Sequence, residues 1–468
     1  MVSIPEQLRE CIQYSFLMDE SRYYNKAVET LGRDDLDALI DERVSYTISY
    51  AAEHSPFYRD WFRAHHIDPR DVRTHEDLLS LPIISGKTVR ENQPPQTPEF
   101  RFRSAPLGDI FTIHETSGTS GVPKSFFLTY EEWLRYAEKY ARIFVSQGFR
   151  AGDRVVVCTT YGMNVGANTM TLAAHRIGFT MIPTGNCNFP VRTLTSYRPT
   201  AIIGSVFKLL HLARRLGNEG INIQDLGLEK LVVGGEGFAQ EAREYVRELW
   251  GCGVYNTYGS TEGSMCGECH QLTGLHVPED LVHLDIYDPA MAEFVKEGDC
   301  GRAVLTTLLP VGAKCGTLLI NYDTEDTTAV ISSDRCPCGR THMRIINPQR
   351  EAETVWVNGA PFNRVDIERG VFQHDNMQYL TGEYEAFLYT GQDEHETIMR
   401  VSLESEDPDH CDTRRIGEQF LDSFLKGRPA LSAAHADGSF KILFGFTKTG
   451  GLELHTLKGR PKRLVDRR

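Results

Sequence analysis

The sequence predicts an α/β protein, with a large N-terminal domain of α/β layers that includes a β subdomain and a small α+β C-terminal domain. Short apolar segments at 154–158, 201–204 and 230–233 alternate with stretches of helical spacing, which is typical of a largely parallel sheet covered by helices. Ligands of such sheets gather at the carboxyl ends of the strands. The chain of 468 residues is long enough for two or three domains.

The individual elements can be followed along the chain. Up to about residue 90, apolar residues keep helical spacing, as in Leu8, Ile12, Phe16, Leu36, Leu39, Ile40 and Val44. Ile113 and the apolar run 126–128 predict two strands of a hairpin. After the segment 230–233, a glycine-rich turn precedes a helix that runs to Trp250, and a strand is expected at 253–255. We expect β structure from 301 to 329 and mixed strands and helices after about 350. The expected domains are therefore residues 1–351 and 352–468.

Composition and charge argue against a nucleic-acid-binding, membrane-spanning or disulfide-rich secreted protein. A net charge of −14 argues against a general nucleic-acid binder, because phosphate backbones would be repelled. No apolar run approaches the roughly 18 residues of a membrane span, and the N-terminus lacks the basic start and apolar core of a signal peptide. The 11 cysteines fit reduced thiols, with a metal site, better than a disulfide framework. We expect a cytoplasmic monomer or homodimer without nucleic-acid or membrane partners.

The stretch 116–124 is the strongest candidate for a binding site. It consists of Thr116, Ser117, Gly118, Thr119, Ser120, Gly121, Val122, Pro123 and Lys124. Glycines let backbone N–H groups approach phosphate oxygens, hydroxyls donate further hydrogen bonds, and the lysine adds a positive charge. The common P-loop needs a glycine directly before the lysine, where this chain has Pro123. We therefore expect a nucleotide-phosphate loop in another architecture; a flexible Gly/Ser linker is the alternative.

Two further stretches can complete a nucleotide site. The first consists of Tyr258, Gly259, Ser260, Thr261 and Glu262. Its tyrosine ring can stack on a purine, Thr261 can bond a phosphate, and Glu262 can hold Mg²⁺, which prefers oxygen ligands. The second, 322–327, is an acidic turn in which a carboxylate can accept both hydroxyls of a ribose. Taken alone, the first stretch could be an ordinary turn and the second a solvated one.

Together and in this order, these motifs resemble the adenylate-forming acyl-CoA synthetase superfamily, and within it the phenylacetate–CoA ligase-like branch. The resemblance covers nearly the whole chain. The matching positions are Ser55, Pro56, Phe57, Tyr58, Leu81, Pro82, the loop 116–124, Gly235, Glu236, the stretches 258–262 and 322–326, Arg350, and 463–466.

The resemblance implies a role for each motif. The loop 116–124 with Lys124 would cradle the ATP phosphates, and Gly235, Glu236, Gly237 and Tyr258 would line the adenine site. Thr261 and Glu262 would face the α-phosphate and Mg²⁺, while Asp326 and Arg350 would hold the ribose. The substrate's carboxylate would attack the α-phosphorus to form an acyl-adenylate and pyrophosphate, and the thiol of coenzyme A would then displace AMP. Catalysis would come from positioning and charge stabilisation, with a small, mobile C-terminal domain that rotates between the half-reactions.

Two positions depart from the family pattern. The family has a catalytic lysine in a Gly-Lys-x-x-Arg motif near the C-terminus, and this chain has Arg460 at that position. Because arginine is a planar fork and lysine a compact charge, either Arg460 or the neighbouring Lys458 or Lys462 could take the role. The C-terminal basic cluster that contains them could otherwise be a solvated end. The hinge position, two residues after Arg350, is Ala352, where the family usually has Asp or Lys.

Four separated residues suggest a structural metal site. Cys269 and His276 precede Cys336 and Cys338, and three thiolates with one imidazole suit tetrahedral Zn²⁺. Cys266 could replace Cys269, and His342 could replace His276. Some ligases of the resembled branch look as though they carry such a zinc. Buried free cysteines that act as small apolar groups are the alternative.

The resemblance also indicates where the acyl group would bind. The pocket would be built around Tyr161, Gly162, Asn164, Val165, Gly185, Asn186 and Ser205. Because Asn164, Asn186 and Asn188 are polar, we expect a polar-substituted acid, either a hydroxylated or aminated aromatic acid or a small hydroxy acid. The asparagines could instead cap loops. Two other functions stay open, an acyl-AMP ligase that loads a carrier protein and a nucleotide-binding sensor without turnover.

Overall fold

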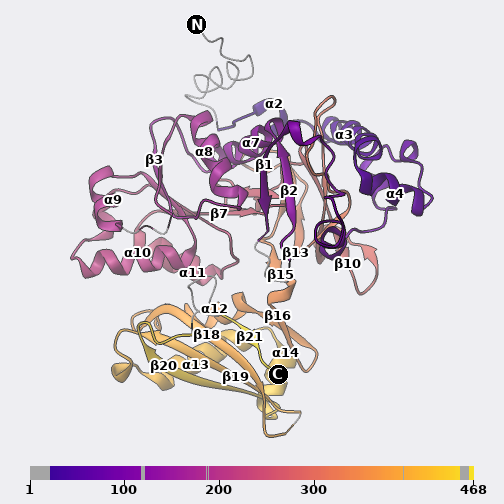
Figure 1. Ribbon diagram of the computed structural model, residues 1–468. Helices are drawn as coiled ribbons and strands as arrows, with labels where there is room; N and C mark the ends of the chain where they lie inside the picture. Colours follow the sequence, from indigo (N-terminus) through magenta and orange to yellow (C-terminus); the bar gives the residue numbers. More distant parts are fainter. Residues whose placement is uncertain (1–21, 117–121, 186, 188, 394, 454–462) are drawn as a thin grey trace.

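The computed structural model describes residues 22–116, 122–185, 187, 189–393, 395–453 and 463–468, which form two lobes (Figure 1). The larger lobe contains a 13-stranded sheet in the order β11-β10-β12-β13-β14-β9-β8-β7-β6-β5-β3-β4, with β15 paired to β13. From Thr354 onward the strands belong to two separate sheets in the smaller lobe. The α/β fold class expected from the sequence is confirmed.

The parallel part of the large sheet explains the apolar segments in the sequence. Its strands are β3 (Arg154–Val157), β4 (Thr180–Pro183), β5 (Ala201–Gly204), β6 (Lys230–Gly234) and β7 (Gly253–Gly259). Because successive side chains of a strand point to opposite faces, Val155 and Ile203 pack on one side while Val156 and Ile202 pack on the other. Both faces are buried, so each strand is a continuous apolar run.

Helices cover both faces of these strands. They are α7 (Tyr130–Ser146), α8 (Val165–Ile177), α9 (Pro190–Tyr197), α10 (Val206–Asn218) and α11 (Gln240–Trp250). Side chains of α7 and α8 share a core with Val155, and those of α10 and α11 share a core with Val156. Asn164 caps α8 through a 2.6 Å hydrogen bond from the N–H of Gly166, and Ser205 caps α10. These caps place polar residues where the strands end.

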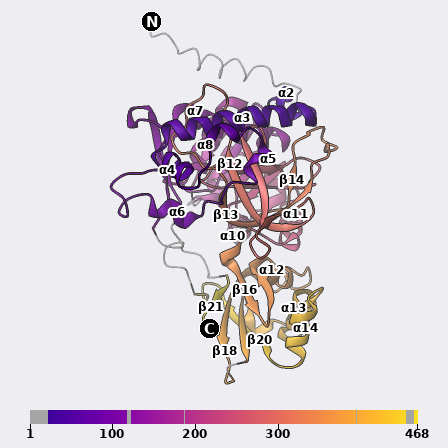
Figure 2. The same cartoon turned by 90° about the vertical axis from the view of Figure 1, so that its right-hand side faces the viewer.

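The remaining part of the larger lobe is helical at its start and β-rich at its end. Its helices are α2 (Lys26–Glu29), α3 (Arg33–His54), α4 (Pro56–Ala64), α5 (His75–Leu78) and α6 (Gly86–Glu91). Its strands are the hairpin β1 (Ile110–Glu115) and β2 (Ser125–Thr129), then β8 (Met265–Glu268), β9 (Leu275–His276), β10 (Val282–Asp288), β11 (Glu293–Phe294), β12 (Cys300–Thr307), β13 (Tyr322–Ser332), β14 (Arg344–Ile345) and β15 (Gln349–Arg350). The helix α3 shares an apolar core with β10 and β12, and Figure 2 shows α3 running across the end of β12.

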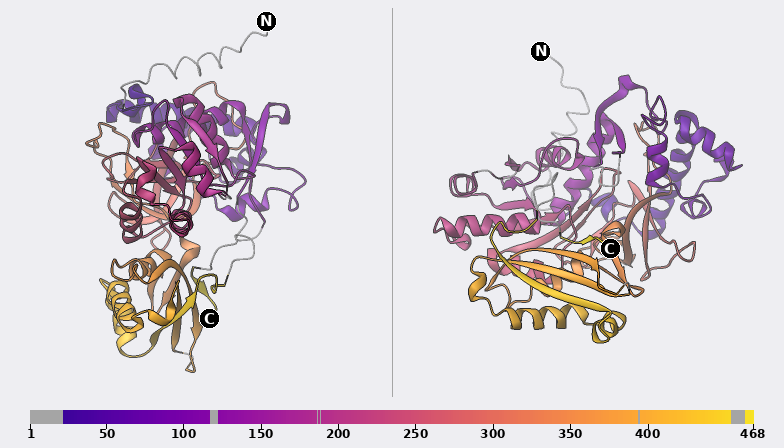
Figure 3. Two further views of the ribbon diagram at one scale, coloured as in Figure 1. Left: turned by 90° about the vertical axis from the view of Figure 1, so that its left-hand side faces the viewer. Right: turned by 60° about the horizontal axis from the view of Figure 1, so that its bottom comes forward.

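The smaller lobe has its own sheets and helices. Its strands are β16 (Thr354–Val357), β17 (Ala360–Asn363), β18 (Leu380–Thr390), β19 (Thr397–Ser405), β20 (Phe440–Lys448) and β21 (Val465–Asp466). Its helices are α12 (Arg364–Val371), α13 (Thr413–Leu425) and α14 (Pro429–Ala436). The sheet β20-β19-β18-β21 lies beside α13 and α14 (Figure 3), while α12 and β18 contact α11 and α10 of the larger lobe.

Most expected elements have counterparts in the structure. The strands at 154–158, 201–204 and 230–233, the helix that ends at Trp250 and the hairpin around 116–124 are all present. The expected helical positions Leu8, Ile12 and Phe16 lie outside the described residues. Among the described helices, none has the length and apolar content to cross a membrane.

Candidate active site

A cavity of about 260 Å³ lies at the carboxyl ends of β3, β5 and β6. It is lined by Asn164, Ser205, Gly235, Glu236 and Gly259, all of which the sequence assigns to the acyl or nucleotide site. The caps of α8 and α10 bring the first two residues here, and the turn after β6 brings the next two. Residues proposed for two different ligands therefore border one space.

Other proposed pocket residues lie elsewhere. Tyr161, Gly162, Val165 and Gly185 are not among the residues that line the cavity, and Asn186 and Asn188 lie outside the described part of the chain. The Tyr161 hydroxyl is 3.0 Å from the hydroxyl of Thr171, and Val165 is buried at the start of α8.

Several lining residues were missed from the sequence, among them Cys158, Thr159 and Lys208. The Lys208 Nζ donates a 2.6 Å hydrogen bond to the Cys158 carbonyl, which joins α10 to the end of β3. Cys158 and Thr159 directly follow the apolar strand β3, and Lys208 lies in the first turn of the helix after β5, so their closeness to strand ends was the available signal.

The two ends of the glycine-rich loop are held together by the β1–β2 hairpin. The N–H of Lys124 donates a 3.0 Å hydrogen bond to the Thr116 hydroxyl. The Lys124 Nζ lies 2.8 Å from Glu262 Oε1 and also donates to the Tyr322 hydroxyl. Ser117, Gly118, Thr119, Ser120 and Gly121 lie outside the described residues. The loop's lysine and the proposed Mg²⁺ ligand thus meet in the fold.

The turn between β7 and β8 carries Ser260, Thr261 and Glu262. Burial favours a raised pKa for Glu262, but the ion pair with Lys124 holds it below its usual value. Lys139 of α7 braces the turn by donating a 2.8 Å hydrogen bond to the Gly263 carbonyl, and burial lowers the pKa of this lysine to about 8. The buried Ser260 hydroxyl has no hydrogen-bond partner among the described residues. The turn therefore presents a carboxylate and a hydroxyl on a fixed backbone.

Asp326 and Arg350 face each other on paired strands. They are partners in the register of β13 and β15, and Arg350 Nε lies 3.1 Å from Asp326 Oδ1. The Tyr258 hydroxyl donates a 2.5 Å hydrogen bond to Asp326 Oδ2. Burial raises the pKa of Asp326, and the positive charge of Arg350 offsets only part of this shift. The tyrosine proposed for the adenine site and the two residues proposed for the ribose therefore form one connected group.

The turn after β6 packs closely against neighbouring strands. A Cβ added at Gly237 would lie 2.3 Å from the Gln349 side-chain oxygen, and one at Gly234 would lie 2.5 Å from the Thr257 carbonyl. Glu236 Oε2 lies 3.2 Å from the Nη1 of Arg364, the first residue of α12. Arg364 was missed from the sequence, because nothing local links positions 128 residues apart.

The four proposed metal ligands converge into one buried cluster. Single ligand atoms of Cys269, His276, Cys336 and Cys338 all lie within 4.8 Å of one another. Cys269 Sγ is 3.9 Å from Cys336 Sγ, and His276 Nε2 is 3.7 Å from Cys338 Sγ. The alternative ligands are elsewhere: Cys266 belongs to the apolar core under α3, and both ring nitrogens of His342 contact backbone atoms.

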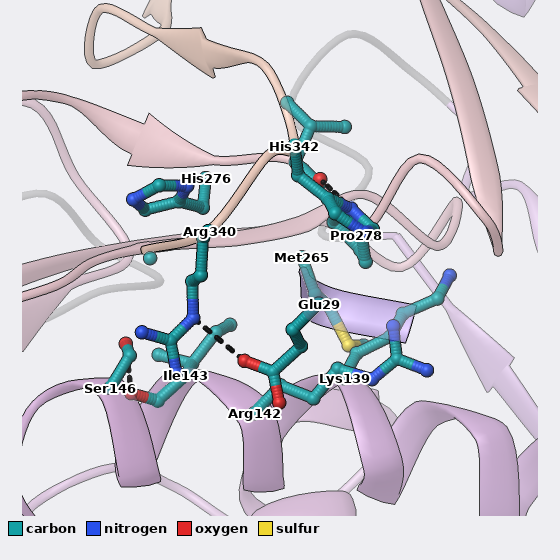
Figure 4. A pocket seen from close by; sticks show the side chains of 12 residues that line it. Glu29, Lys139, Arg142, Ile143, Ser146, Met265, His276, Pro278, Arg340 and His342 are labelled. Carbon is teal, nitrogen blue, oxygen red and sulfur yellow. Dashed lines mark hydrogen bonds and ion pairs between the residues drawn. The ribbon is translucent and has the colours of Figure 1, made fainter. Parts of the chain in front are cut away.

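Two charged residues, Arg340 and Glu29, lie next to this cluster. Arg340 Nη1 lies 3.7 Å from Cys338 Sγ, and its Nε donates a 2.7 Å hydrogen bond to Glu29. Figure 4 shows Arg340 and Glu29 facing each other in a small cavity bordered by His276. The Tyr23 hydroxyl donates to the Cys338 carbonyl at 2.8 Å. The turn that carries the two close cysteines is thereby attached to the start of the chain.

The C-terminal candidates Lys458, Arg460 and Lys462 lie outside the described residues. The next residue, Arg463, places its guanidinium 3.6 Å from the centre of the Phe207 ring in α10 and donates to the Tyr384 carbonyl at 3.1 Å. The segment that follows the proposed catalytic position is therefore anchored between the two lobes.

Comparison with known proteins agrees with this geometry. Residues 52–307 match the model of the AMP-binding enzyme family. A phenylacetate-coenzyme A ligase of Thermus thermophilus is 30% identical over 328 residues, which cover 69% of this chain and 72% of that protein. The crystal structure of a 2-hydroxyisobutyryl-CoA ligase in the postadenylation state superposes with a TM-score of 0.80 at 23% identity, over 96% of this chain and 93% of that one. The same enzyme in the thioesterification state gives 0.66 at 24% identity and the same coverage. The chain belongs to the AMP-binding enzyme family and is an AMP-forming acyl-CoA synthetase of the phenylacetate–CoA ligase-like branch.

Proposed function

We propose that this chain activates a polar-substituted carboxylic acid with ATP, releases pyrophosphate, and transfers the acyl group from the acyl-adenylate to the thiol of coenzyme A. The observation that carries the proposal is the single cavity bordered by Asn164 and Ser205 on one side and by Gly235, Glu236 and Gly259 on the other. A carboxylate and an α-phosphate bound in one cavity are already close to the geometry of attack.

The proposed nucleotide contacts follow from the groups around this cavity. Lys124 would contact the β- and γ-phosphates with the loop 116–121, and Asp326 with Arg350 would hold the ribose hydroxyls. The Ser260 hydroxyl, which has no partner among the described residues, supports a ligand at the β7–β8 turn, because buried hydroxyls normally have a partner. Glu262 is a carboxylate, the ligand type that Mg²⁺ prefers, and its ion pair with Lys124 would open when the metal binds.

We also propose that residues 352–468 rotate as a unit between the half-reactions, with a hinge near Ala352. The 2-hydroxyisobutyryl-CoA ligase matches this chain better in its postadenylation state than in its thioesterification state, with TM-scores of 0.80 and 0.66. This difference supports an arrangement of the two lobes here that is closer to the postadenylation state. Among Arg460, Lys458 and Lys462, we propose Arg460 for the adenylation step because it occupies the family's lysine position.

The acid is proposed to carry a hydroxyl or an amino group. Thr159, Asn164, Ser205 and Lys208 give the cavity a polar lining, and polar groups that a bound acid would cover discriminate strongly against ligands that leave them unpaired. The Asn164 amide oxygen is already used as the cap of α8, so we assign recognition to the other lining groups as well.

The cysteine and histidine cluster is proposed to hold a structural Zn²⁺. Three sulfurs and one imidazole nitrogen within 4.8 Å match a closed tetrahedral site. The zinc would tie β9 to the turn 336–340 and would leave no open position for catalysis. We therefore expect the zinc to stabilise the fold and to take no part in the reaction.

The proposed function is tested by measuring acid-dependent pyrophosphate release from ATP. The panel would contain phenylacetate, 4-hydroxyphenylacetate, 2-aminobenzoate and 2-hydroxyisobutyrate, with and without coenzyme A. We expect release with at least one substituted acid, and AMP formation that depends on coenzyme A. Better turnover of phenylacetate would refute the substituted acid, AMP formation only with an acyl carrier protein would favour the carrier-loading ligase, and no release with any acid would favour a nucleotide sensor.

A further inference from the structure

One charged contact joins the smaller lobe directly to the proposed nucleotide site. Arg364 is 4% exposed and begins α12. Its Nη1 lies 3.2 Å from Glu236 Oε2, and its Nη2 donates a hydrogen bond to the carbonyl of Gly237. Glu236 lines the cavity. A side chain of the smaller lobe thus contacts both a carboxylate and the backbone of the turn that would border the adenine.

The position of Arg364 is fixed by a second carboxylate, Glu368, one helical turn later. Arg364 Nε lies 3.3 Å from Glu368 Oε1, which also accepts a 3.2 Å hydrogen bond from the Tyr384 hydroxyl. The other oxygen of Glu368 accepts a 3.0 Å hydrogen bond from the N–H of Ala239 in the larger lobe. Glu368 therefore holds the guanidinium and at the same time joins the two lobes.

This network exists only while the lobes keep their present arrangement. A rotation of residues 352–468 would carry Arg364 away from Glu236, which would leave a carboxylate in a poorly hydrated site without this cation. The turn 235–237 would then lose both its ion pair and the hydrogen bond to its backbone. A contact that is present in one state and absent in the other biases the equilibrium between them and is itself biased by any ligand at the turn.

We propose that Arg364 is a positioning residue for adenylation, which sets the turn 235–237 for the nucleotide only in the domain arrangement seen here. The inference rests on the proposed function and deepens it. It assigns Arg364 no contact with the reacting atoms. Its effect reaches the nucleotide through Glu236 and the Gly237 carbonyl, so rotation of the lobe for thioester formation would also loosen the nucleotide turn.

The test separates the two half-reactions in an Arg364→Met variant. With ATP and an acid that the wild-type protein turns over, we expect pyrophosphate release to fall about 5- to 150-fold with a raised KM for ATP, the range typical of coupling between sites. Thioester formation from the synthetic acyl-adenylate of that acid and coenzyme A should stay within about twofold, because rotation of the smaller lobe would already have broken the contact in that state. AMP titration by calorimetry should give a correspondingly weaker Kd.

A matched control breaks another ion pair between the lobes. Arg214 of α10 lies 3.2 Å from Glu404 of β19 and does not line the cavity, so Arg214→Met should leave both half-reactions within about twofold. Arg364→Lys keeps a charge without the fork and should recover part of the lost pyrophosphate release.

Three outcomes would overturn the inference. They are equal losses in both half-reactions of Arg364→Met, unchanged AMP affinity, or the same split in Arg214→Met. A wild-type protein without acid-dependent pyrophosphate release would instead refute the proposed function itself, and that result is seen before any variant is made.

Discussion

The buried ion pair between Lys124 and Glu262 predicts that one combination of substitutions keeps the protein stable while it abolishes activity. We consider Lys124→Met, Glu262→Gln and the double variant. The two side chains are 5% and 3% exposed and their charged atoms are 2.8 Å apart. Removing either partner leaves the other charge buried without its counter-ion, whereas removing both leaves two neutral groups of similar size.

The magnitude follows from this burial. Loss of one partner from a buried pair typically costs about 3–5 kcal/mol, so we expect Lys124→Met to lower the free energy of unfolding by about that amount at pH 7. The double variant should regain most of the loss. An exposed pair provides the control: Lys87 and Glu91 are 78% and 56% exposed at 3.6 Å, and Lys87→Met should change stability by less than about 1 kcal/mol.

The effect should also depend on pH in a defined direction. In the wild-type protein the pKa of Glu262 is lowered, so the pair contributes stability above the ordinary carboxyl pKa and loses it as the pH falls through the lowered value. In Lys124→Met the carboxyl can take up a proton, so the penalty should be largest at neutral pH and should shrink in acid.

Urea unfolding of the wild-type protein, the two single variants, the double variant and Lys87→Met at pH 7 and pH 4.5 provides the measurement, with pyrophosphate release measured in parallel. The double variant should be folded and stable but inactive, because both groups are assigned to the phosphates and Mg²⁺. The reasoning is refuted if Lys124→Met is no more destabilising than Lys87→Met, or if the effects of the two single changes simply add in the double variant.

Three further predictions concern packing, metal and pH. Gly316→Ala places a Cβ 2.3 Å from a backbone carbonyl of β2 and should lower the free energy of unfolding by about 1–3 kcal/mol. Gly108→Ala, whose added Cβ would meet no atom within 4 Å, should leave it nearly unchanged. Thermal unfolding of the two variants tests this difference. Cys338→Ser should remove stoichiometric zinc in elemental analysis and lower the melting temperature, whereas Cys300→Ser, at an exposed thiol, should do neither. Burial raises the pKa of Glu368 to about 7, so stability should fall as the pH rises from the ordinary carboxyl pKa toward 7, and Glu368→Gln should reduce this dependence in urea titrations.

Each of these results can fail informatively. Equal melting temperatures for the two glycine variants would show that β2 can move to accept the added methyl group. Zinc-free wild-type protein would leave the four converging residues as a cluster of buried thiols and an imidazole. If the pH dependence of stability is the same in Glu368→Gln as in the wild-type protein, another titrating group causes it.

Local patterns accounted for much of the fold. The continuous apolar runs of β3, β5 and β6 identified strands buried on both faces, since only such strands need no polar alternation. Ile113 and the apolar run 126–128 predicted the two strands of the hairpin around Lys124. These features could be predicted because their information lies within a few consecutive residues.

The sequence by itself therefore determined the α/β class and the motifs that carry the family resemblance. Only the tertiary structure decided that Lys124 pairs with Glu262, that Lys208 borders the cavity, and that Arg364 reaches Glu236 from the other lobe. The physical reason is that periodicity and turn chemistry act over a few residues. Contacts across 128 positions depend instead on how sheets, helices and lobes pack, which no short segment encodes.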